Sequence, residues 1–165
     1  MSISVSTAER VAYGRPLDPA RDRTDVRVAP RPTTALIGRI FLGAIFLMSG
    51  IAKLTDSSGT VQHMEQAGIP SADLLHWIAG VAEVLGGLSL MTGLLARVGA
   101  IGLIAFTALA TYYFHAFWKL EGAERLPQMV NFMKNLAIVG GLMLLVAHGP
   151  GRYSIDYKLR KPLQA

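Results

Sequence analysis

The chain of 165 residues contains no cysteine. Disulfide bonds, thiolate zinc sites, iron–sulfur clusters and thiol redox chemistry carried by this chain are therefore excluded. The chain also has fewer polar residues than a water-soluble domain, because 52% of its residues are hydrophobic. This composition predicts one small membrane domain, which does not need a large core shielded from water.

The first 32 residues lack a sustained apolar period, and they lack the apolar run of a signal peptide. They hold six arginines and four acidic residues. An organellar transit peptide would be poor in acids, so the composition disfavours a targeting role. We expect residues 1–32 to form a disordered basic tail on the cytoplasmic side of a membrane.

Four apolar runs follow, at about residues 33–54, 72–93, 96–118 and 128–148. Each is long enough for a helix to cross a hydrocarbon core of roughly 30 Å. Gly149, Pro150 and Gly151 end the last run. We predict an all-α fold, a four-helix transmembrane bundle over residues 33–149, followed by a basic C-terminal tail at 150–165.

Glu83 lies near the middle of the second run. Because an isolated charge in hydrocarbon is costly, we expect this carboxylate to face the bundle interior and to meet opposite charge. His76, Gly80 and Gly87 fall on the same helical stripe, which is typical of helices packed closely in lipid. The other runs supply candidate partners, which are Arg39, Lys53, His115, Asn131, Lys134 and Asn135.

Helical rise places Arg39 and Lys134 at depths from which long side chains could contact Glu83. We therefore expect Glu83 to pair with at least one of these two cations. One interpretation is a charge network that only fixes helix register. The other is a polar pocket in which the cations stabilise an anionic or carbonyl group while Glu83 moves a proton.

The pocket interpretation gives each candidate a role. Glu83 and His115 are the catalytic candidates, and the binding candidates are Arg39, Lys53, Asn131, Lys134 and Asn135. A quinone is the cofactor that this chemistry suits, because its reduction develops negative charge on oxygen and takes up protons. No metal site is predicted. A haem held by His76 and His115 is geometrically conceivable but disfavoured, because the sequence shows no second histidine pair for an electron relay.

Three stretches resemble the DoxX family of small bacterial membrane proteins: GRIFLGAIFLMSGIAKL, AEVLGGLSLMTG with its glutamate, and KNLAIVGGLMLL followed by GPGRYSID. The resemblance covers about residues 32–158. It implies four membrane helices, a bacterial inner-membrane location and a link to respiratory or redox chemistry. Relatives include a membrane subunit of a thiosulfate:quinone oxidoreductase, and a membrane partner that assembles with superoxide dismutase and a sulfurtransferase. By position, the resemblance marks Arg39, Lys53, Glu83, Lys134 and Asn135.

Three functions stay open. The first is a quinone-linked redox subunit, the membrane part of an oxidoreductase, whose electrons would come from a soluble redox partner because the chain has no thiol. The second is a non-catalytic scaffold that anchors such partners at the membrane. The third is a small-solute carrier, which four helices without an evident repeat or broken helix support poorly unless the protein forms a homo-oligomer. Nucleic acid is not an expected partner, because the basic residues concentrate in the tails rather than on a folded face.

Charge asymmetry predicts the topology. The two tails and the hairpin between the second and third runs hold eleven Lys and Arg residues, against two in the opposite loops. By the positive-inside rule, both termini should be cytoplasmic.

Reporter fusions at Ser58 and Glu121 should therefore report the outer side, and fusions at both termini the inner side. A cytoplasmic signal from either loop would contradict this orientation.

Overall fold

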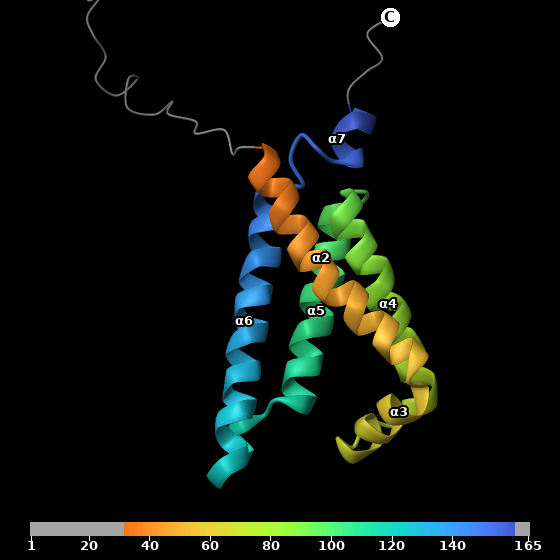
Figure 1. The fold of residues 1–165 in the computed structure, drawn as a ribbon, viewed down its shortest axis with the longest axis vertical. Coiled ribbons are helices and arrows are strands. Elements are labelled where there is room, and N and C mark those ends of the chain that lie inside the picture. The colour runs from red at the N-terminus through yellow and green to blue at the C-terminus, as the bar shows by residue number, and fades with distance from the viewer. Residues whose placement is uncertain (1–31, 161–165) are drawn as a thin grey trace, which may run out of the picture.

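The computed structural model describes residues 32–160 (Figure 1). The expected N-terminal tail, apart from Pro32, and residues 161–165 lie outside the described residues. The described part is helical and contains no strand. Its elements are α2 (Pro32–Thr55), α3 (Ser57–Gln66), α4 (Ala72–Thr92), α5 (Ala96–Phe114), the 3₁₀ turns η1 (Phe117–Lys119) and η2 (Gly122–Glu124), α6 (Arg125–His148) and α7 (Ile155–Arg160).

Within residues 32–160, four segments are long and apolar enough to cross a membrane, and they contain α2, α4, α5 and α6. The predicted all-α, four-helix membrane bundle is therefore confirmed. The helix bounds differ from the expected ones at the end of α5, which is Phe114 rather than about 118, and at the start of α6, which is Arg125 rather than about 128. Pro127 fits in the first turn of α6, where a backbone N–H would have no intrahelical partner. The side of the membrane on which the termini lie stays a prediction.

The bundle consists of two helix pairs. Helix α2 packs mainly on α4, and α6 packs mainly on α5, while contacts between α4 and α5 join the pairs and those between α2 and α6 are slight. Figure 1 shows the pairs close together near α7 and diverging toward α3. The connection between the first two spans contains α3, which packs mainly against α4.

Glycines bring α2 and α4 into close contact. A Cβ atom added to Gly50 would lie 2.7 Å from the carbonyl oxygen of Gly80, and one added to Gly87 would lie 2.7 Å from that of Gly43. The predicted packing stripe of α4 is buried as expected, including His76 and Glu83. Small residues thus let the two backbones approach so closely that polar side chains can bond across the contact.

The C-terminal segment docks on the bundle. Asp156 donates its backbone N–H to the carbonyl of Gly93 (3.0 Å), and its carboxylate accepts hydrogen bonds from the backbone N–H groups of Leu95 (2.8 Å) and Ala96 (3.1 Å). These amides belong to the unpaired donors at the start of α5. A residue far along the chain therefore caps α5, and residues 150–160, which the sequence indicates only as a tail, belong to the folded domain.

The α2–α4 contact predicts different effects for two glycine substitutions. Gly87→Ala should destabilise the protein by about 1–3 kcal/mol, because the new methyl group meets backbone that cannot move without separating the helices. Gly140→Ala is the matched control, since nothing lies within 4 Å of the position of its Cβ atom. Thermal unfolding in detergent measures both. Equal melting temperatures for the two variants would show that close packing of α2 on α4 is not required.

Candidate functional site

Glu83 forms an ion pair with Lys53, whose side chain is 28% exposed. The glutamate is 3% exposed, and its Oε2 lies 2.8 Å from Lys53 Nζ. Its Oε1 accepts a hydrogen bond from the Ser49 hydroxyl (2.9 Å), which in turn accepts one from Lys53 Nζ (2.7 Å). Because Ser49 and Lys53 are four residues apart on α2, both face the same part of α4. The carboxylate thus obtains the opposite charge that its depth requires.

The expected pairing of Glu83 with Arg39 is wrong. Arg39 is 1% exposed and donates to the carbonyl oxygens of Leu90 (3.4 Å) and Tyr153. The rise of α2 separates Arg39 from Lys53 by about 21 Å, so the two cations lie in opposite halves of the bundle. Leu90 is in the last turn of α4, where carbonyls have no intrahelical donor. These free carbonyls attract the guanidinium, and Arg39 therefore joins the C-terminal segment to the bundle.

The expected pairing of Glu83 with Lys134 is also wrong. Lys134 Nζ donates to Asn131 Oδ1 on its own helix (2.9 Å), and within residues 32–160 the ion pair of Glu83 is with Lys53 alone. Asn135 donates to the Thr111 hydroxyl across the α5–α6 contact (2.9 Å). Lys134 is thus a cation without a counter-ion in the described part of the chain.

A cavity of about 550 Å³ lies within the diverging half of the bundle. Side chains from α2, α3, α4, α5 and α6 line it, so it is bordered by both helix pairs. Its walls are largely apolar and include the rings of Phe106, Tyr113 and Phe114. The charged and hydrogen-bonding side chains at its surface include Ser49, Lys53, Thr60, His63, Glu83, Thr107, His115, Lys134 and Asn135.

The cavity brings together most of the predicted site residues. Glu83, Lys53, His115, Lys134 and Asn135 all line it. Two predicted residues do not: Asn131, which instead accepts the hydrogen bond from Lys134, and Arg39, which lies in the opposite half of the bundle.

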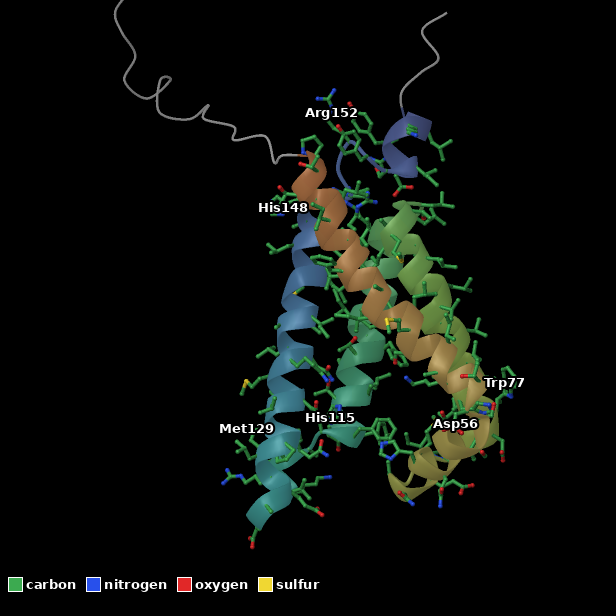
Figure 2. All side chains as sticks on the ribbon, in the orientation of Figure 1. Asp56, Trp77, His115, Met129, His148 and Arg152 are labelled. Atoms are coloured by element: carbon green, nitrogen blue, oxygen red, sulfur yellow. The ribbon has the colours of Figure 1, made fainter. Side chains whose placement is uncertain are left out.

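His115 follows the last residue of α5, beside α6 (Figure 2). Its Nδ1 lies 2.7 Å from Gln128 Oε1. This contact fixes the ring between the two helices, while the side chain still borders the cavity.

Besides Arg39 Nε and the ion-paired Glu83 Oε2, two buried side chains have polar atoms without a hydrogen-bond partner within the described residues. The Thr107 hydroxyl belongs to a side chain that is 5% exposed and that lines the cavity. His76 has both ring nitrogens unpaired and packs against the Trp77 ring, with centroids 5.0 Å apart. His76 does not line the cavity that His115 borders, so the two histidines do not share this site.

Sequence reasoning missed the part that α3 plays. His63 of α3, which lies outside the four apolar runs, stacks on Phe114 of α5 with ring centroids 4.8 Å apart and lines the cavity. A short polar helix carries no apolar period that could have revealed this contact. Thr107 could have been found, because it falls on the same stripe of α5 as Thr111 and His115.

Comparisons with known proteins give a family and relatives. The DoxX family model matches residues 34–116. The chain is 37% identical over 128 residues to the inner membrane protein YphA of Escherichia coli, covering 78% of this chain and 91% of YphA. It is 40% identical over 126 residues to the inner membrane protein YqjF of E. coli, covering 76% and 92%. An uncharacterized membrane protein, Rv3486 of Mycobacterium tuberculosis, is 32% identical over 142 residues, covering 81% and 85%. No solved structure matches the chain.

A double-mutant cycle measures the Lys53–Glu83 interaction. Glu83→Gln or Lys53→Met alone leaves one charge without its partner, whereas the double variant removes both. The two losses in unfolding free energy should therefore be non-additive by about 0.5–3 kcal/mol.

The matched cycle pairs Glu83→Gln with Lys134→Gln. Lys134 bonds within its own helix, so the effects of these two substitutions should add. Additive effects in the Lys53 cycle, measured by thermal unfolding in detergent, would contradict the ion pair.

Proposed function

Because the chain belongs to the DoxX family of membrane proteins, we propose that it binds a quinone, or a lipid-soluble molecule with a similar carbonyl head group, in the cavity beside Lys53 and Glu83. The chain is a multi-pass protein of the bacterial inner membrane. The observation that carries the proposal is Thr107, whose side chain lines the cavity and whose buried hydroxyl has no hydrogen-bond partner in the described part of the protein. A buried hydroxyl without a hydrogen bond is costly, and a ligand oxygen would supply the missing partner.

The size and the position of the cavity suit a ligand that enters from the lipid bilayer. A volume of about 550 Å³ lies within the range of roughly 300–1,000 Å³ that is usual for small-molecule sites. The cavity lies in the half of the bundle where the helix pairs diverge, and contacts between α2 and α6 are slight. A head group could enter between these two helices directly from the bilayer.

The donor set fits a quinone ring. Lys53 comes from the α2–α4 side, and Lys134 and Asn135 come from the α5–α6 side. A quinone carries carbonyl oxygens on opposite sides of its ring, and ammonium, amide and hydroxyl donors from both helix pairs can bind them. Phe106, Tyr113 and Phe114 provide aromatic surface against which a flat ring can pack.

The same residues could serve redox chemistry. A bound quinone would accept electrons and protons, and negative charge that develops on its oxygens would be stabilised by Lys134, which has no counter-ion among the described residues. Glu83 and His115 are the proton-transfer candidates, since both border the cavity. The electrons would come from a soluble partner protein. This makes the chain the membrane subunit of a quinone-linked oxidoreductase.

Quinone-dependent stabilisation tests the proposal. A short-chain ubiquinone or menaquinone at about 100 times its Kd should stabilise the detergent-purified protein by about 2.7 kcal/mol, because a ligand that binds only the folded state shifts the unfolding equilibrium. For a chain of this size, that corresponds to roughly 5–10 °C in melting temperature. Lys134→Gln should reduce the shift. Lys119→Gln is the matched control, because Lys119 does not line the cavity.

Two alanine-to-phenylalanine variants distinguish specific quinone binding from partition of the quinone into detergent. Ala110 lines the cavity, whereas Ala108 is exposed on the same helix and does not. Ala110→Phe should abolish the quinone-dependent shift, and Ala108→Phe should preserve it. Absence of a shift in the wild type at saturating quinone, together with absence of copurifying quinone by mass spectrometry, would refute the pocket and leave the scaffold hypothesis.

A further inference from the structure

A second cavity, of about 310 Å³, lies at the opposite end of the bundle. The start of α5, the end of α6 and the docked segment around α7 line it. Because α5 begins and α6 ends here, this cavity lies at the level where the helices leave the membrane rather than in the hydrocarbon core. Figure 2 shows His148 and Arg152 near this end, far from His115 and the first cavity.

The second cavity is strongly basic. Arg97, Arg152, Arg160 and His148 line it, against one acidic residue, Asp156. The Asp156 carboxylate is already engaged by the backbone N–H groups at the start of α5. Within residues 32–160, neither the Arg152 nor the Arg160 side chain forms a hydrogen bond or ion pair, so both guanidinium groups are available to an anion.

Arg97 is held in place at the edge of this cavity. Its guanidinium lies against the backbone of Gly149 and donates to the carbonyl of Ala147 at the end of α6 (3.5 Å). Gly149 has a φ of 80° and no Cβ atom, so the backbone turns sharply and leaves room for the arginine. The fold thereby positions one cation, and the other two remain free to move toward a ligand.

An apolar groove continues from the basic cavity. Leu95 and Val98, which are 63% and 66% exposed, line both the cavity and a groove that follows α4 and α5 into the membrane-spanning part. Gly102 lies in this groove and has nothing within 4 Å of its Cβ position. A basic cavity joined to an apolar groove matches a ligand with an anionic head and a hydrocarbon chain, whereas a free phosphate ion would use only the cavity.

We propose that this end of the protein binds an anionic glycerophospholipid, with its phosphate in the cavity between Arg97, Arg152 and Arg160 and an acyl chain in the groove beside Leu95 and Val98. Guanidinium groups form paired hydrogen bonds with phosphate oxygens, which favours phosphate over weaker anions. Basic cavities at the ends of membrane helices are typical sites for anionic lipid head groups. The lipid would bridge α5, α6 and α7 at the membrane surface.

Native mass spectrometry of the full chain in detergent tests this site. Dioleoylphosphatidylglycerol should bind more tightly than dioleoylphosphatidylcholine. Since one basic residue near an anionic surface contributes a factor of about five, the double variant Arg152→Gln, Arg160→Gln should bind phosphatidylglycerol about 25-fold more weakly. Arg125→Gln is the matched control, because Arg125 is exposed at the other end of α6.

A second pair of variants tests the groove without changing charge. Gly102→Leu fills the groove and should weaken phosphatidylglycerol binding, whereas Gly140→Leu, at an equally open position outside the groove, should not. Equal binding of the two lipids, or an equal loss in Arg125→Gln, would overturn the proposal. So would full competition by millimolar inorganic phosphate, which would show an anion site that takes no lipid.

Discussion

The Lys53–Glu83 ion pair is the interaction on which the half of the bundle around the first cavity depends. A carboxylate near the middle of a spanning helix is tolerated only if the bundle brings opposite charge and hydrogen bonds to it. Lys53 and Ser49 do so because glycines let α2 lie directly on α4. The same contact leaves α2 with little packing against α6, and the space between the two helix pairs becomes the cavity. Satisfying one buried charge thus shapes the site beside it.

Polar groups are divided between the two ends of the bundle. One end holds the Lys53–Glu83 pair, Lys134 and His115 around a cavity. The other end holds Arg39, which donates to the carbonyls of Leu90 and Tyr153, and Asp156, which accepts from the unpaired N–H groups at the start of α5. The residues around the cavity leave space for a ligand, whereas Arg39 and Asp156 attach the C-terminal segment to the bundle.

The sequence is sufficient for the fold class and for most of the cavity residues, because long apolar runs and a lone intramembrane glutamate carry strong physical constraints. It is insufficient for the partners of the cations. The depths of Arg39 and Glu83 along their helices suggest that the two side chains can meet. An estimate from depth alone takes no account of the backbone carbonyls that compete for the guanidinium. The docking of residues 150–160 and the stacking of His63 on Phe114 depend on contacts between distant segments, which periodicity does not encode.

The cap of α5 has a consequence for how the protein is made. Asp156, which accepts a hydrogen bond from the backbone N–H of Ala96, is synthesised sixty residues after it. The carbonyl of Tyr153 likewise accepts a hydrogen bond from Arg39 of the first spanning helix. All four spanning helices have therefore left the ribosome before either bond can form. The segment around α7 can therefore contact the first and third spans only after all four spanning helices have been synthesised.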